Sequence, residues 1–100
     1  MILREVYTKL PVSGDVSWNT ISDLRGVMQQ LVVNSSATST TFDFSITDDN
    51  GNIVFNKKGN KGTLIDDSKI GLFGIYTMSI ANASTDSNSF STTLMWREHV

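Results

Sequence analysis

The sequence predicts an all-β protein, an antiparallel two-sheet β-sandwich of about 7–8 short strands with jelly-roll or immunoglobulin-like topology. Val, Ile, Thr and the aromatic residues total 36 of the 100 residues, whereas the good helix formers (Ala, Leu, Glu, Lys, Gln, Arg and Met) total 26. Branched and aromatic side chains suit a pleated surface and lose freedom in a helix. Alternating apolar segments also recur between clusters of turn-forming residues, as short strands require.

The N-terminal region predicts two strands. Residues 2–10 are expected to form a strand that ends at Pro11, and a second strand is expected over residues 16–21. Terminal segments are easily lent to a neighbouring subunit. We therefore expect the first strand and the Val100 end to act as arms in contacts with other subunits.

Residues 21–33 fit two structures. Helical spacing relates four apolar residues, Ile21, Leu24, Met28 and Leu31. Against a helix, Gly26 lies in its middle, where glycine costs about 1 kcal/mol relative to alanine. Val32 and Val33 also favour a strand. We predict a strand in which residues 27, 29, 31 and 33 share one face, with a helix as the alternative.

Residues 40–57 predict a β-hairpin. Phe42, Phe44 and Ile46 alternate with polar residues, which is the period of a half-buried strand. The segment 48–52 (Asp-Asp-Asn-Gly-Asn) supplies a tight turn, and the apolar run 53–55 resumes a strand.

The C-terminal half predicts a short strand and a second hairpin. A turn at 59–62 precedes a strand at 63–65, and residues 66–72 form either one helical turn or a loop that crosses between sheets. Residues 73–81 and 90–98 then alternate around a polar loop at 83–89 and pair as a hairpin. The core side of this hairpin holds Tyr76, Met78, Ile80, Phe90, Leu94 and Trp96, and Met95 faces outward.

Composition narrows the functional classes. One hundred residues make a single domain, 1–100. The absence of cysteine excludes disulfides, thiolate metal sites and cysteine nucleophiles. A net charge of −2 argues against nucleic-acid binding, and no apolar run is long enough for a membrane-spanning helix. Arg4 and Glu5 interrupt any signal peptide, so we expect synthesis in a host cytoplasm.

Catalytic chemistry has little support in the sequence. The single histidine, His99, is next to the C-terminus, and Glu5 and Glu98 also lie near the ends of the chain. The acidic turn at 48–52 fails the EF-hand pattern, although Asp48 and Asp49 with an aspartate at 66 or 67 could form a looser calcium site. The basic residues at 57–61 are read as a solvated hairpin end. We predict a non-enzymatic protein with no cofactor and no metal.

Four residues are predicted to make contacts with other proteins. Arginine and aromatic side chains are enriched at the anchor positions of interfaces. Trp18 is the aromatic residue whose orientation the pattern leaves open, so it is the best candidate for an exposed ring. Arg25, Met95 and Arg97 complete the predicted contact set.

The order of segments from Gly26 onward resembles small virion accessory proteins of tailed bacteriophages, namely capsid cement or decoration proteins and neck or tail components. The resemblance covers about three quarters of the chain: a strand at 27–33, the segment 40–46, the acidic turn 48–51, the segment 74–84 and a last strand ending at 96–98. It implies a virion location and a capsid protein, another virion protein or further copies of the chain as partner.

Two functions follow from these observations. The first is a non-enzymatic structural protein of a tailed phage that binds the capsid or neighbouring subunits in many copies. The alternative is a carbohydrate-binding module or an adhesin or tail-fibre-like domain. A sugar-binding surface requires two or more exposed, roughly coplanar aromatic rings, whereas an assembly protein requires a broad apolar or hydroxyl-rich patch.

Overall fold

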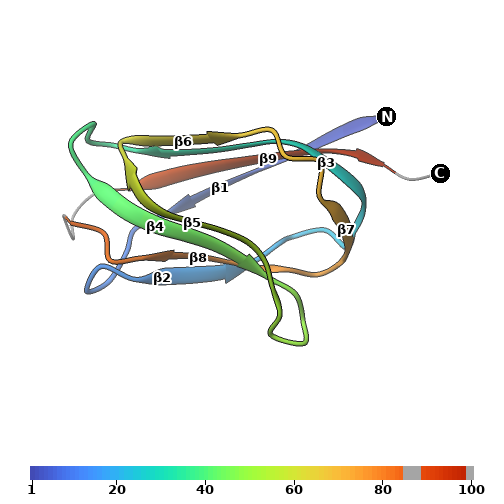
Figure 1. Ribbon diagram of the computed structural model, residues 1–100, viewed down its shortest axis with the longest axis horizontal. Helices are drawn as coiled ribbons and strands as arrows, with labels where there is room; N and C mark the ends of the chain where they lie inside the picture. The colour runs from blue at the N-terminus through green and yellow to red at the C-terminus, as the bar shows by residue number, and fades with distance from the viewer. Residues whose placement is uncertain (85–88, 99–100) are drawn as a thin grey trace.

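The computed structural model describes residues 1–84 and 89–98, which form nine strands and no helix. The predicted all-β sandwich is confirmed: the strands make two antiparallel sheets that face each other as two layers (Figure 1). The strands are β1 (Ile2–Lys9), β2 (Val16–Asn19), β3 (Leu24–Ser35), β4 (Thr41–Thr47), β5 (Ile53–Lys61), β6 (Thr63–Asp66), β7 (Gly71–Gly74), β8 (Thr77–Ala81) and β9 (Phe90–Glu98).

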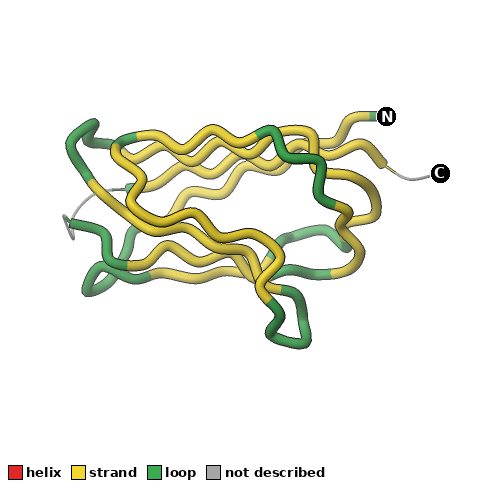
Figure 2. The backbone as a smooth tube through the Cα atoms, in the orientation of Figure 1, coloured by secondary structure: helices red, strands yellow, loops and turns green. Residues whose placement is uncertain are grey.

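The strand pairing follows the jelly-roll pattern. One sheet has the order β1-β9-β3-β6, with β7 also paired to β3, and the other has the order β2-β8-β4-β5. Strands β6 and β7 lie end to end along β3, opposite residues 31–34 and 24–27 respectively. When β6 and β7 are counted as one strand, each strand pairs with the strand that has the same rank counted from the other end of the chain. The pairs are β1 with β9, β2 with β8, β3 with β6 and β7, and β4 with β5. Figure 2 shows the loops that carry the chain between the layers.

Strand β3 contains a bulge that explains the ambiguous pattern at 21–33. Its pairing with β9 shifts between Met28 and Gln30, which leaves Gln29 as the extra residue. Met28 and Leu31 are therefore both buried although they are three residues apart. The strand prediction is confirmed, but residues 27, 29, 31 and 33 do not share one face, because Val27 is exposed while Leu31 and Val33 are buried.

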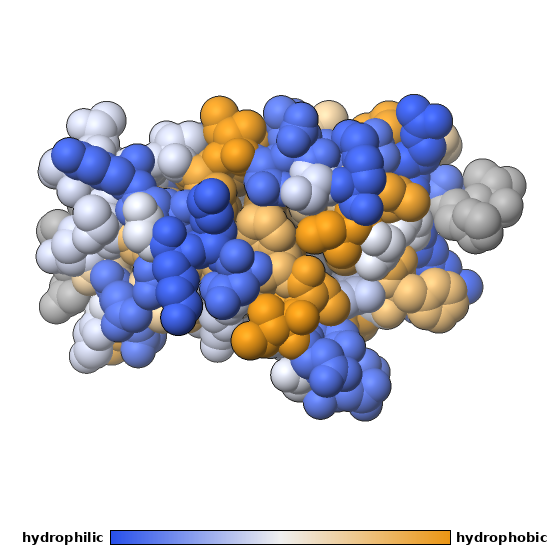
Figure 3. Space-filling model, viewed as in Figure 1, coloured by the Kyte–Doolittle hydropathy of each residue, from blue (hydrophilic) through white to orange (hydrophobic). Residues whose placement is uncertain are grey.

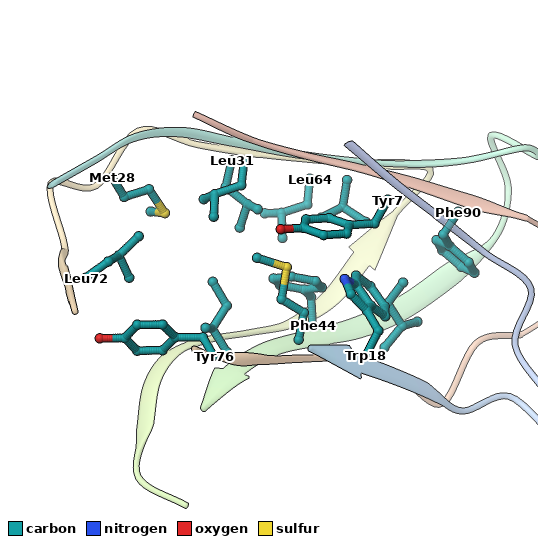
Figure 4. Close-up of a cluster of buried hydrophobic side chains, with 14 of the residues drawn as sticks. Tyr7, Trp18, Met28, Leu31, Phe44, Leu64, Leu72, Tyr76 and Phe90 are labelled. Atoms are coloured by element: carbon teal, nitrogen blue, oxygen red, sulfur yellow. The ribbon is translucent and has the colours of Figure 1, made fainter. Parts of the chain in front are cut away.

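The core lies between the two layers and is rich in aromatic rings (Figure 4). Phe42 and Phe90 meet edge to face across the layers, with ring centroids 5.0 Å apart. Trp18 lies between Tyr7 and Phe44, with centroid distances of 5.9 and 6.5 Å. These rings link β2 and β4 of one sheet to β1 and β9 of the other.

The predicted second hairpin is wrong. Its two strands exist as β8 and β9, but β8 pairs with β2 and β4 while β9 pairs with β1 and β3. The connection between them crosses from one layer to the other. The chain also bends at residues 75–76, so that 71–74 belongs to one sheet and 77–81 to the other. By contrast, the predicted hairpin at 40–57 is confirmed by the pairing of β4 with β5.

The bend between β7 and β8 is held from both sides. The Thr20 backbone N–H donates to the Tyr76 carbonyl oxygen at 2.9 Å, and the Tyr76 N–H donates to the Thr20 hydroxyl at 3.1 Å. The Phe73 N–H in turn donates to the buried Tyr76 hydroxyl at 2.7 Å. The backbone of β7 is thus anchored to the core, which fixes where the Phe73 ring projects.

Candidate interaction surface

The outer side of the β1-β9-β3-β6/β7 sheet gathers most of the contact residues predicted from the sequence. Side chains alternate across a strand, so the residues between the core positions of this sheet point away from the sandwich. We call this surface the arginine face. Its outward residues include Ile2, Arg4, Val6, Arg25, Val27, Gln30, Val32, Ile65, Phe73, Thr93, Met95 and Arg97.

The apolar side chains of the arginine face lie in two cross-strand rows, with a row of Arg4, Met95 and Gln30 between them. The register places Ile2 opposite Arg97 and Arg97 opposite Val27. A second row joins Val6 through Thr93 and Val32 to Ile65. Phe73, 76% exposed, lies beside Arg25 on the neighbouring strand. Exposed apolar groups that gather on one face are typical of surfaces that bind other proteins.

All three arginines of the chain lie on this one face, and no aspartate or glutamate is among its outward strand residues as described. Asp23, at the border of the face, contacts the Arg25 guanidinium at 3.4 Å, with both side chains more than half exposed. The same guanidinium lies 5.3 Å from the centroid of the Phe73 ring, within cation–π range. The face is therefore positive in a protein whose net charge is −2.

A hollow of about 220 Å³ opens on the arginine face beside Phe73. It is lined by Gly26, Val27, Gly71, Leu72 and Phe73. Gly71 leaves space between the larger side chains, because nothing lies within 4 Å of a Cβ atom placed on it. An apolar cavity of about 150 Å³ accepts a benzene ring, so the hollow has room for one apolar side chain of a partner.

The outer side of the other sheet is different in character. Its outward residues on β2, β8 and β4 are mostly hydroxyl or amide side chains: Ser17, Asn19, Thr77, Ser79, Asp43, Ser45 and Thr47. At one end, the Asn82 amide donates to Asp43 at 2.9 Å, and the Asn82 N–H donates to Asp15 at 3.0 Å. The two layers of the sandwich therefore present chemically distinct faces.

Figure 3 shows that the hydropathy of the surface also changes along the length of the molecule. The half that carries the connection between β3 and β4 is hydrophilic, and the orange side chains gather toward the half that carries β7 and the two termini. The arginine face follows the same gradient. Its polar outward residues, Thr8, Asn34, Thr63 and Ser91, share one row at the hydrophilic end.

Three of the four predicted contact residues come together on the arginine face: Arg25, Met95 and Arg97. The fourth prediction is corrected by the structure, because Trp18 is only 7% exposed and packs in the core. The short strand β2 places it opposite Met78, and its ring is enclosed by Tyr7 and Phe44. An indole with this burial cannot serve as an exposed contact.

Sequence reasoning missed Phe73 and Arg4. Phe73 was placed in a single strand over 73–81 with no side assigned to it, although its alternation with the buried residues Tyr76 and Met78 was a signal that it faces outward. For Arg4, the strand prediction was correct, and its position between Leu3 and Glu5 was the available signal. Those two neighbours are partly buried on the core side, so Arg4 points outward.

The arrangement of aromatic rings bears on sugar binding. Tyr76, Phe90 and Trp96 are buried, as predicted, and so is Tyr7. Among the described residues, Phe73 is the one exposed aromatic residue, and Phe55 is partly buried against the core. Two exposed, coplanar rings are therefore not present among the described residues.

The acidic turn at 48–52 has a structural role in the β4–β5 hairpin. The Asp48 carboxylate accepts hydrogen bonds from the backbone N–H groups of Asn52 and Asn50, at 2.8 and 3.0 Å, and from the Asn52 side-chain amide at 3.2 Å. The bond from the Asn52 N–H is the main reason that the pKa of Asp48 is lowered. Within residues 1–84 and 89–98, no three His, Asp or Glu side chains gather as metal ligands. His99 lies outside the described residues.

No protein-family model matches the chain, and no curated protein matches it. Among solved structures, the chain is similar to a chain in the structure of infectious bursal disease virus, Gt strain, with 13% sequence identity and a TM-score of 0.42. The similarity covers 96% of this chain and 32% of the viral one, so the chain spans about a third of that protein. A likeness this slight supports no inference about function. None of the described segments is a helix able to span a membrane.

Proposed function

We propose that the protein is a non-enzymatic structural component of a tailed-phage particle, located in the virion, and that it binds the capsid or a neighbouring virion subunit through the arginine face. The observation that carries the proposal is the composition of that face. It combines all three arginines, Met95, the exposed Phe73 ring and five exposed or half-buried aliphatic side chains.

This composition is the one expected of a protein–protein interface. Interface centres are enriched in arginine, methionine and aromatic residues and are depleted in lysine, aspartate and glutamate. None of the five lysines is an outward strand residue of the arginine face: Lys9 points to the Trp18 ring, and the other four lie on β5 or in the β6–β7 connection. The Arg25–Phe73 pair beside the hollow resembles the anchor residues that dominate binding energy.

The resemblance of the sequence to virion accessory proteins supports the location in a phage particle. Jelly rolls occur in viral capsid domains and also in lectins and cupins, so the fold alone does not select a function. The properties of the two outer faces favour assembly over sugar binding, because one face has the character of an interface and paired exposed rings are absent from the described residues. Many copies on a particle would add avidity to a modest single contact.

The experiment that tests this function is a search for the chain on particles. Lysate of a phage-producing culture that makes the protein is fractionated on a density gradient, and each fraction is probed with an antibody against the chain. We expect the protein in the particle band, at a copy number above one per particle by quantitative mass spectrometry. If the chain stays in the soluble fractions while the major capsid protein bands normally, the proposed function is wrong.

A further inference from the structure

We propose that the partner of the arginine face is a second copy of this chain, and that the β4–β5 hairpin turn of one copy seats on the arginine face of the next. This inference rests on the proposed function and specifies one partner for the same surface. It depends on three observations: the chemistry of the turn, the hollow on the face, and the positions of the two on opposite sides of the molecule.

The β4–β5 hairpin turn carries negative charge, which is opposite in sign to the charge of the arginine face. Asp48 and Asp49 lie side by side at the turn, and Ile53, 63% exposed, follows them at the start of β5. Asp48 is held by hydrogen bonds from Asn50 and Asn52, so the turn is preformed. Asp49 is exposed and takes no part in those bonds. The turn therefore presents acidic groups beside one exposed aliphatic side chain.

The arginine face offers the complementary groups. Arg97 is the cross-strand partner of Val27, and Arg25 lies two residues before Val27 on β3. Val27 lines the hollow together with Phe73. The hollow of about 220 Å³ can accept the Ile53 side chain, while the carboxylates of the turn meet the guanidinium groups around it. Arginine suits this contact because its planar guanidinium binds carboxylates with two parallel hydrogen bonds.

The geometry of the fold requires the contact to form between copies. The turn belongs to the sheet that contains β4 and β5, and in Figure 1 it projects from the body on the side away from β1, β9, β3 and β6. One copy therefore cannot place its own turn on its own arginine face. A contact between two different surfaces is head to tail, and it produces a closed ring or an open filament.

The experiment measures self-association of the purified full-length chain by light scattering over a concentration series. We expect the mass to rise to a discrete ring or to grow continuously as a filament. Asp49→Lys and Arg97→Glu should each weaken association at least about tenfold, because each places like charges together. The combined variant, D49K with R97E, restores the pairing with reversed charges and should recover most of the association.

A control makes the result specific. Lys61→Glu reverses an exposed charge at the end of β5 that is distant from the turn, on the sheet that does not carry the hollow, and it should leave association unchanged. A wild-type chain that is monomeric at every concentration overturns the inference, as does a double variant that associates no better than the single variants. Neither result affects the particle-binding test, which would still succeed if the arginine face binds a different virion protein.

Discussion

Gly26 shows how a single residue sets the distance between two strands. A Cβ atom placed on it would lie 1.9 Å from the carbonyl oxygen of Arg97, which belongs to the backbone of the neighbouring strand β9. Glycine at this position therefore allows β3 and β9 to approach closely, beneath the point where Val27 and Arg97 form the arginine face. Gly26 is therefore part of a strand that closely approaches its neighbour, and not of a helix.

We predict that Gly26→Ala lowers the free energy of unfolding by about 1–3 kcal/mol, because the added methyl group overlaps backbone atoms that cannot move aside. Gly71→Ala is the matched control, since nothing lies within 4 Å of a Cβ atom at that position. Urea unfolding of the two variants measures the difference. Equal midpoints for both would show that the close approach is not needed.

From the raised pKa of the Tyr7 phenol, we predict that the protein loses stability at alkaline pH. Burial, followed by the hydrogen bond that its hydroxyl donates to Glu5, raises the pKa of the Tyr7 phenol well above its ordinary value of 10.0. Above pH 10 the unfolded chain releases this proton and the folded chain keeps it, so the free energy of unfolding falls as the pH rises toward the folded-state pKa.

The variant Tyr7→Phe has no phenolic proton to release. Its free energy of unfolding should therefore decrease less steeply above pH 10 than that of the wild type, although it is less stable near neutral pH because Glu5 loses a partner. Thermal unfolding at closely spaced pH values measures both slopes. Parallel alkaline slopes in the two proteins would contradict this account of Tyr7.

At the scale of elements, the bulge in β3 determines which side chains of this strand face the core, and this assignment can be tested by mutation. Leu31→Ala should cost about 2–5 kcal/mol of stability, since the side chain is fully buried. Gln30→Ala should be close to neutral, because Gln30 lies outward opposite Met95. A regular strand without the bulge would bury Gln30 together with Met28, and would reverse the order of the two effects on chemical denaturation.

Strand β1 is a structural part of the sandwich as well as a terminal segment. It pairs with β9 over its full length, from Ile2 opposite Arg97 to Lys9 opposite Phe90, and it places Tyr7 in the core. We therefore predict that removing residues 1–10 abolishes cooperative thermal unfolding. Val6→Ser, on the outward side of the same strand, should unfold near the wild-type temperature. A truncated chain that melts cooperatively would support the expectation of a lendable arm.

The sequence predicted best the elements whose partners are close along the chain. The β4–β5 hairpin follows from local alternation and from turn residues that need no distant partner. The β8 and β9 strands were also found, but their assignment to one hairpin failed because each pairs with strands far away in the sequence. Which strands meet across a jelly roll depends on how the whole chain rolls up, and local patterns do not contain that information.

The contact residues could be predicted only where the strand phase was clear. In β9 the regular alternation from Phe90 to Trp96 correctly placed Met95 and Arg97 outside. The four-residue strand β2 is too short to reveal its phase, so the orientation of Trp18 stayed open and its predicted exposure was wrong. Phe73 was missed although the alternation places it outward, since Leu72, Tyr76 and Met78 are all buried and the bend at 75–76 leaves this phase unchanged.

At the scale of the whole molecule, the central feature is the chemical difference between the two layers. One outer face carries the arginines, Phe73 and Met95, and the other carries hydroxyl, amide and carboxylate groups. The acidic turn between β4 and β5 projects from the second layer (Figure 1). This distribution gives a small protein a positive, partly apolar surface for binding and a hydrophilic surface that remains compatible with water.

The most direct test of this account asks which face binds the particle. The double variant Arg97→Glu with Phe73→Ser alters the arginine face, and the control Ser17→Glu with Ser45→Glu changes the net charge by the same amount on the other face. Both are added as tagged chains to a phage-producing culture and followed into the particle band of a density gradient. We predict that the arginine-face variant is lost from the band and the control is retained. Equal retention of the two, or loss of the control alone, would contradict the arginine face as the contact surface.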